Sequence, residues 1–181
     1  MSRSILVLVA TLIPVASASG DMVRGIGIDF VTIGNPGNPG DTRTEANPVG
    51  GGAVNYTYRI GKYEVTNAQW DAFVSAAGAP TGNPITAYDQ DVYWTGMYVP
   101  ANQVSWYEAA QFCNYLTSGD KSRGAYRFSG DNSNPGDFVG IDRATAQAIY
   151  GTVYCLPTED EWEVTRNHSL EAGQGCIGKN G

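Results

Sequence analysis

Histidine and cysteine are scarce in this sequence, and their scarcity limits the chemistry that it can carry. The chain has 181 residues but one histidine, His168, and three cysteines, Cys113, Cys155 and Cys176. A metal site needs several such ligands, and His168 has only Cys176 nearby, at a spacing that no common site uses. A catalytic thiol needs a base, and none is evident beside Cys176. These residues therefore predict no metal site and no catalytic cysteine.

The three cysteines are an odd number, so at least one lies outside any disulfide within the chain. Cys113 falls on the inward face of a predicted helix, where a free cysteine usually fills apolar space. The alternative is that Cys113 forms a disulfide with a partner further along the chain. The pairing of the cysteines stays open at this point.

Basic residues are also few. The chain has 11 lysines and arginines against 18 aspartates and glutamates, a formal net charge of −7. Nucleic acids and anionic membranes attract positive patches, so this balance argues against both as partners. The 23 glycines and the low charged fraction of 16% are typical of a loop-rich globular domain. We expect a single domain whose partner is unknown, a protein or peptide ligand being one candidate.

No apolar run is long enough to cross a membrane. The run Ile5–Val15 falls short of the roughly 20 residues that a span requires. Arg3 precedes it and the tripeptide Ala-Ser-Ala follows at 16–18, which is the pattern of a cleavable secretory signal. We predict a signal peptide at 1–18, with an uncleaved anchor as the alternative, and a linker at 19–29. The protein is then exported, to the periplasm or the medium.

Three predicted helices begin with the same signature, a capping box. In this motif a hydroxyl accepts a hydrogen bond from the backbone N–H three positions on, and the longer side chain at that position reaches back. The three pairs are Thr66 with Gln69, Ser105 with Glu108, and Thr158 with Glu161. The third helix also carries an acidic first turn, which complements the positive helix N-terminus rather than indicating acid–base catalysis.

Apolar residues follow each cap at helical spacing. The first helix is expected to end at Gly78 in the left-handed conformation, and the second to run from Trp106 to about Leu116. One common core is predicted from Trp70, Phe73, Trp106, Cys113 and Trp162. The other predicted elements are strands at Phe30–Ile33, Val54–Ile60, Tyr126–Phe128 and Val153–Leu156, and a short helix at Asp142–Tyr150.

Two irregular segments invite a functional interpretation. Thr81–Pro100 carries four aromatic residues. We expect their rings to fill space between the loops, in preference to forming a surface that stacks on sugars or peptides. Asp131–Asp142 places oxygen-bearing side chains at several positions of a calcium-binding loop. Its fifth position is Pro135 and its last is not glutamate, so a polar turn before a helix cap at Asp142 is the better interpretation.

Three segments, in this order, resemble the formylglycine-generating enzyme family, also called sulfatase-modifying factors. They are Tyr63–Trp70 (YEVTNAQW), Asn102–Leu116 (NQVSWYEAAQFCNYL) and Leu156–Glu163 (LPTEDEWE), and the likeness covers about Phe30 to Trp162. The resemblance implies an α+β, loop-rich fold related to C-type lectins. The best-known members oxidise a sulfatase cysteine to formylglycine with two cysteines and a copper ion, and the family also binds calcium. Non-catalytic binding proteins share this fold, so fold does not settle function.

The resemblance stops after Trp162. Residues 163–181 contain no counterpart of the family's Arg-Gly-Gly-Ser-Trp motif, calcium ligands or cysteine pair, so no catalytic or cofactor-binding residue is carried over. We therefore expect an incomplete domain at 30–166 and a poorly ordered, Gly-rich tail at 167–181, either truncated or frame-shifted.

Two hypotheses remain for the function. The chain is either a family member that descends from an oxidase, without activity of its own, or an exported binding or structural module on a lectin-like scaffold. Genomic sequence past Gly181 that encodes the missing motif would favour the first.

Overall fold

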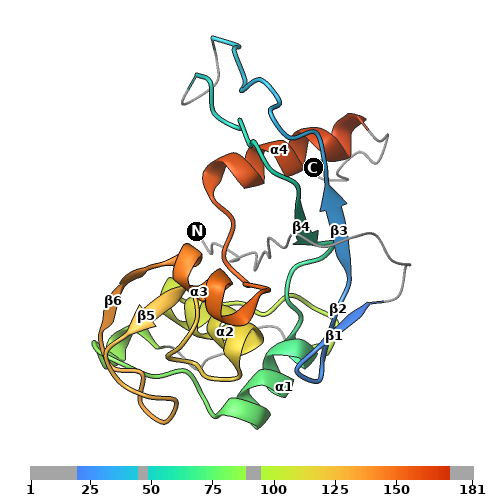
Figure 1. Ribbon diagram of the computed structural model, residues 1–181. Helices are drawn as coiled ribbons and strands as arrows, with labels where there is room; N and C mark the ends of the chain where they lie inside the picture. Colours follow the sequence, from blue (N-terminus) through green and yellow to red (C-terminus); the bar gives the residue numbers. More distant parts are fainter. Residues whose placement is uncertain (1–19, 45–48, 89–94, 172–181) are drawn as a thin grey trace.

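Short antiparallel strand pairs and helices make up the part of the chain that the computed structural model describes, residues 20–44, 49–88 and 95–171 (Figure 1). The strand pairs are β1 (Asp21–Val23) with β2 (Ile26–Ile28), β3 (Phe30–Ile33) with β4 (Tyr58–Gly61), and β5 (Tyr126–Phe128) with β6 (Phe138–Ile141). The helices are α1 (Asn67–Ala77), α2 (Trp106–Ser118), α3 (Arg143–Tyr150) and α4 (Glu159–Glu171), with a 3₁₀ turn at Ile85–Ala87. This mixture is consistent with the predicted α+β class. None of the described helices is both long and apolar enough to cross a membrane.

The first strand pair corrects the predicted linker at 19–29. Residues 21–28 form a β-hairpin whose two-residue loop, Arg24 and Gly25, has positive φ at both positions (50° and 83°). That conformation suits the right-handed twist of the flanking strands. Val23 and Ile26 are buried in the main core of the molecule. The segment is therefore part of the folded domain, because its alternating apolar residues have a helix to pack against.

Most apolar side chains meet in one cluster, the large core, between the first hairpin, α1, α2 and the β5–β6 pair. Its centre is a set of rings, with Phe73 of α1 in edge contact with Phe112 of α2 at 5.2 Å between centroids. The large core consists of Val23, Ile26, Ile28, Val65, Phe73, Ala109, Ala110, Phe112, Cys113, Tyr115, Leu116, Ala125, Tyr126, Phe128, Ala146, Val153, Cys155 and Leu156.

A second cluster, the small core, lies between the β3–β4 pair and α4, in the upper part of Figure 1. It consists of Ile33, Val54, Tyr58, Ile60 and Val164. The predicted strand Val54–Ile60 is shorter than expected, since β4 begins at Tyr58. Val54 bonds instead to the loop at Gly37 and Asn38, its carbonyl accepting at 2.7 Å and its N–H donating at 3.1 Å.

The predicted single core of five residues is only partly correct. Phe73 and Cys113 are fully buried in the large core, and Trp70 packs against it half-buried. Trp106, the first residue of α2, is 37% exposed, although its ring makes edge contacts with Phe138 at 4.9 Å and with Tyr126 of the large core at 5.3 Å. Trp162 is 46% exposed because α4 turns its neighbours Glu161 and Val164 inward.

The predicted strand at Val153–Leu156 is not a strand. The segment crosses the large core as an extended connection, and side chains bond its backbone N–H groups. Tyr154 N–H donates to Thr117 Oγ1 at 2.9 Å and Leu156 N–H donates to Tyr126 Oη at 2.7 Å. With these partners the segment needs no neighbouring strand.

Helix ends differ from expectation in two places. Gly78 has positive φ (76°) but an extended ψ (162°), so it ends α1 without the predicted left-handed conformation. Helix α4 continues to Glu171, into the segment that was predicted to be a poorly ordered tail. The predicted signal peptide and residues 172–181 lie outside the described residues.

Candidate functional site

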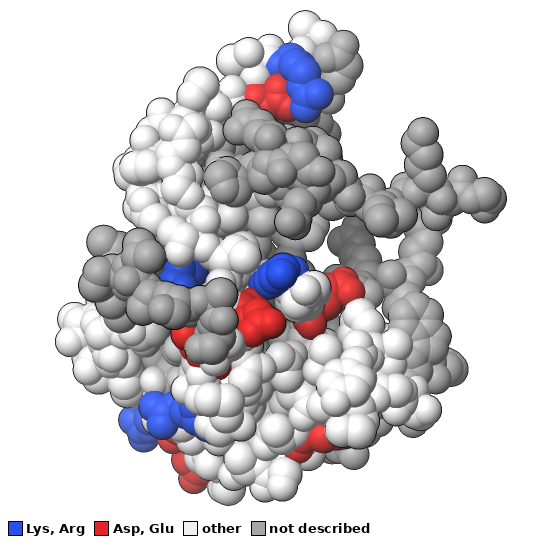
Figure 2. Space-filling view, turned by 90° about the vertical axis from the view of Figure 1, so that its right-hand side faces the viewer, with Lys and Arg blue, Asp and Glu red and all other residues white. Residues whose placement is uncertain are grey.

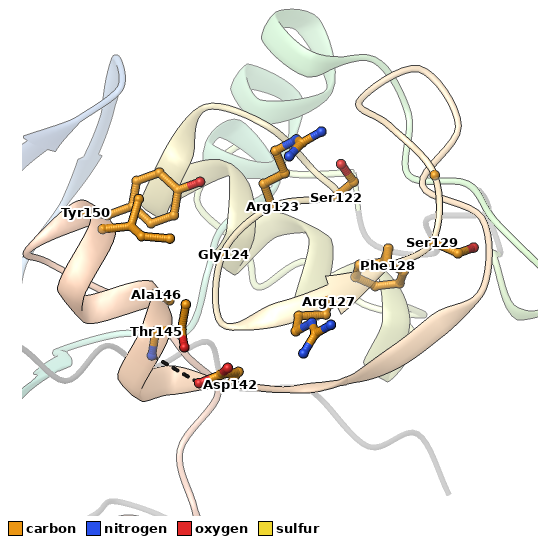
Figure 3. A pocket seen from close by; sticks show the side chains of 12 residues that line it. Ser122, Arg123, Gly124, Arg127, Phe128, Ser129, Asp142, Thr145, Ala146 and Tyr150 are labelled. Atoms are coloured by element: carbon orange, nitrogen blue, oxygen red, sulfur yellow. Dashed lines mark hydrogen bonds between the residues drawn. The ribbon is translucent and has the colours of Figure 1, made fainter.

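A hollow of about 680 Å³ opens between α3, β5 and the turn that leads from α2 to β5. Figure 3 shows Arg123 and Arg127 on separate sides of it, with Tyr150 of α3 and Phe128 of β5 on the walls. Gly119 begins the turn in the left-handed conformation (φ 87°, ψ 4°). The hollow thus lies where three short elements meet.

Buried polar side chains hold the turn in place. Asn114 of α2, fully buried, donates to Lys121 O at 3.0 Å and to Tyr126 O at 2.6 Å. Gly124 is required beside it, because an added Cβ would meet Asn114 Oδ1 at 2.3 Å. Lys121 is buried and donates to Ala79 O at 2.9 Å, and burial lowers the pKa of its ammonium. These bonds tie α1, α2 and β5 together behind the hollow.

The charges around the hollow suit binding more than catalysis. Arg123 pairs with Asp120 at 3.4 Å, while Arg127 is exposed and has no ion pair or hydrogen bond among the described residues. Asp142 caps α3, and hydrogen bonds from Thr145, with Arg127 nearby, lower its pKa and keep it ionised (Figure 3). No histidine or cysteine lines the hollow among the described residues, and its one carboxylate, Asp142, is held by Thr145 in the cap of α3. Guanidinium and aromatic groups of this kind bind anions or rings.

The three predicted capping boxes are present. Both reciprocal bonds form at Thr66 and at Ser105. At α4, Glu161 N–H donates to Thr158 Oγ1 at 3.1 Å and Thr158 N–H donates to Glu161 Oε2 at 2.7 Å. Glu161 is 1% exposed and its other oxygen accepts from Tyr56 Oη at 2.7 Å and from Arg143 at 3.3 Å. The acidic turn of α4 is therefore a structural site, as the sequence pattern predicts.

The two described cysteines are not suited to hold copper. Cys113 and Cys155 are both free thiols, buried in the large core. Burial raises the pKa of Cys113 well above its ordinary value and raises that of Cys155 to about 11. Copper ligation and thiol chemistry both require the thiolate, which these two sites disfavour. Cys176, the remaining cysteine, lies outside the described residues, and one thiol cannot form a pair.

The loop at Asp131–Asp142 is also a poor calcium site. Asp131 Oδ1 accepts hydrogen bonds from Ser133 N, Ser133 Oγ and Asn134 N at 2.8, 2.6 and 3.1 Å. These bonds, the Ser133 hydroxyl first, lower the pKa of Asp131 without any cation. Within the described ranges no three acidic, histidine or cysteine side chains gather closely enough to hold a metal ion. The hydrogen bonds within this loop form the predicted polar turn before the Asp142 cap.

The aromatic residues of Thr81–Pro100 do not behave as one group. Tyr88 is buried, as a wedge should be, while Tyr98 is 88% exposed. Tyr93 and Trp94 lie outside the described residues. The expected wedge role therefore holds for Tyr88 and fails for Tyr98.

Comparison with known proteins decides the family. The family model for the sulfatase-modifying factor enzyme 1-like domain matches residues 29–174, most of the chain. The chain belongs to this family. No curated protein and no solved structure matched it. The match extends past residue 166, where the domain was predicted to end. Helix α4 also continues beyond that residue, to Glu171.

Several residues of this sulfatase-modifying factor domain were not singled out from the sequence. Arg123, Arg127 and Tyr150 meet only because the turn after α2 and the β5–β6 pair bring them together. Asn114 is a polar residue on the inward side of α2 and is fully buried. A polar residue on the inward face of an apolar helix was the one available signal, since a buried amide needs partners.

Proposed function

We propose that this 181-residue chain is an exported binding domain of the sulfatase-modifying factor family, and that it does not by itself oxidise a sulfatase cysteine. The observation that carries this proposal is the burial of Cys113 and Cys155 inside the large core, which also raises the pKa of both thiols. The family's oxidation depends on two closely placed thiolates, because soft Cu(I) prefers sulfur ligands. Neither thiol reaches solvent, copper or a peptide without opening that core.

A binding role is supported by what the surface offers instead. The hollow of Figure 3 presents two guanidinium groups and an aromatic wall on elements fixed by buried hydrogen bonds. Such a preformed site can hold a protein or peptide ligand with little loss of conformational freedom. The family's C-type-lectin-like scaffold, which we infer for this chain as well, is compatible with this use.

The oxidase prediction is tested by direct product analysis. The purified chain is loaded with copper and given oxygen and a Cys-x-Pro-x-Arg peptide, and the aldehyde product is sought by mass spectrometry. We expect no turnover. Turnover that is lost on replacing any one of the three cysteines would overturn the proposal.

Export is a separate part of the proposal and has its own test. Cleavage after Ala18 predicts a mature protein that begins at Ser19. Intact-mass analysis of protein recovered from the periplasm or medium should give that N-terminus. An intact N-terminus on membrane-bound protein would favour the uncleaved anchor instead.

The second candidate is an oxidase of the family type, favoured by the family match over residues 29–174. It requires a cysteine pair that these 181 residues do not supply in accessible form. An Arg-Gly-Gly-Ser-Trp motif with nearby cysteines, encoded past Gly181 in any frame, would support it.

A further inference from the structure

A second hollow, of about 610 Å³, lies between the first hairpin, the Tyr63–Gln69 segment and the chain around Tyr98. The charged residues that line it, Asp29 and Glu64, are both acidic, and the ammonium of Lys62 lies beside its rim. Neither carboxylate has an ion pair or a hydrogen bond among the described residues. We call it the acidic hollow.

The rim of the acidic hollow is unusually apolar for a surface. Met22, Tyr63 and Tyr98 line it and are 71%, 63% and 88% exposed. Tyrosine and methionine are enriched in protein interfaces, and large exposed apolar side chains that gather in one place mark interaction sites. On the face of the molecule seen in Figure 2, acidic and basic side chains lie next to one another near the middle of the view.

The backbone donors beside the acidic hollow are already used. Helix α1 begins here, and a free helix N-terminus would attract an anion. Asn67 N–H donates to Val99 O at 2.9 Å, Ala68 N–H to Met97 O at 3.0 Å, and Gln69 N–H to Thr66 Oγ1 at 3.4 Å. The hollow therefore presents carboxylates and ring faces to a ligand, which together select a cation.

One ring of the rim already contacts a cation from outside the hollow. Lys62 places its ammonium 5.3 Å from the centre of the Tyr63 ring, within the range of a cation–π contact. The frame is also firm, because Gln69 Nε2 donates to Gly27 O at 2.6 Å and joins α1 to the hairpin. A preformed site of this kind binds without first having to order itself.

From this charge complementarity we infer that the acidic hollow binds a lysine or arginine side chain of an extended segment from a partner polypeptide. Asp29 and Glu64 pair with the cationic group, Tyr98 offers a ring face, and Met22 covers the aliphatic stem. The inference deepens the binding role proposed above and rests on it.

The test uses the purified full chain, labelled with ¹⁵N, and the probe peptide acetyl-Ala-Arg-Ala-Arg-Ala-amide. We expect saturable shifts of the amide signals of Gly27, Glu64 and Gln69, weakened by salt, and none with the same peptide carrying glutamate in place of arginine. The double variant Asp29→Asn with Glu64→Gln should bind at least about tenfold more weakly, since two charge pairs are lost. Asp71→Asn removes one charge on an exposed part of α1 and should change nothing.

Variants of Tyr98 test whether the ligand needs an aromatic ring at this position or only an apolar side chain. Tyr98 is so exposed that its replacement should leave the fold intact. Tyr98→Phe keeps the ring and should keep the affinity, while Tyr98→Leu should weaken binding by about two- to fivefold. Shifts spread over the whole acidic surface, an equal effect of Asp71→Asn, or equal binding of the glutamate peptide would overturn the inference. The aldehyde assay has a different readout, so a failure of this inference can be told apart from a failure of the proposed lack of oxidase activity.

Discussion

The large and small cores are held together in different ways. In the large core, rings and aliphatic side chains of α1, α2 and two strand pairs pack against one another, as in the edge contact of Phe73 with Phe112. The small core has five members, and tyrosine hydroxyls supplement its packing. Tyr58 Oη donates to Glu161 O at 2.5 Å, and Tyr56 Oη donates to Glu161 Oε1 at 2.7 Å.

The difference shows how a small apolar cluster can keep a helix in place. Burial contributes in proportion to apolar area, so a small core contributes little by area alone. Here one buried carboxylate, Glu161, joins α4 to the β3–β4 side and, through Arg143, to α3. We infer that α4 leaves the domain by local unfolding before the large core opens.

The largest expected effect is on the large core. Phe73→Ala should lower the free energy of unfolding by about 3–5 kcal/mol, the usual range for emptying a buried aromatic site. Urea unfolding followed by fluorescence would measure it. The matched change in the small core, Ile60→Ala, should cost about 2–5 kcal/mol locally but shift the global midpoint less. An equal global shift would mean that the two cores unfold as one.

The next effect is a pH dependence confined to the large core. Burial raises the pKa of the Cys155 thiol from 9.0 to about 11. The folded chain then keeps a proton that the unfolded chain releases, so this contribution is complete below pH 9 and is lost as pH rises through 11. Two pKa units correspond to about 3 kcal/mol.

Urea unfolding between pH 8 and 11 measures this loss of stability. The difference between the chain and its Cys155→Ala variant reports the Cys155 thiol together with its electrostatic coupling to Cys113 and Tyr126. A parallel loss in the two proteins would show that Cys155 ionises normally in the fold.

Sequence patterns were most informative where one short segment determines its own structure. The capping boxes at Thr66, Ser105 and Thr158 were predicted correctly, because their partners lie three residues away. The inward side of a helix was harder to predict. Trp162 has the residue type of a core position, but whether it faces inward depends on where β3 and β4 lie, and they lie against Glu161 and Val164.

The candidate sites could be predicted far less well than the helices. Arg127 is separated by more than ten residues from Asp142, and Glu64 by more than thirty from Asp29, so no local pattern joins either pair. The first hairpin was also not recognised from the sequence, which predicted a linker there. Its signal was the pair Arg24-Gly25 between apolar alternations, which favours a two-residue turn.

A smaller expected effect concerns the bond that fastens α4. Tyr58→Phe removes the hydroxyl that donates to Glu161 O and should cost about 1 kcal/mol. The carbonyl keeps a second partner, Thr165 Oγ1 at 2.8 Å, so it is not left unpaired. Hydrogen exchange should quicken in α4 and stay unchanged in α2. Faster exchange in both helices would contradict the separation of the two regions.

The smallest effect comes from the same chemical change made in each region. Thr66→Ala and Thr158→Ala each remove a cap bond worth about 1 kcal/mol. Helix α1 packs on the large core, so Thr66→Ala should shift the global unfolding midpoint by that amount. Thr158→Ala should shift it by about half as much or less, because α4 is already released before the global transition. Serine variants at both positions, which keep the hydroxyl, are the controls. A global shift from Thr158→Ala as large as that from Thr66→Ala would mean that α4 unfolds with the large core.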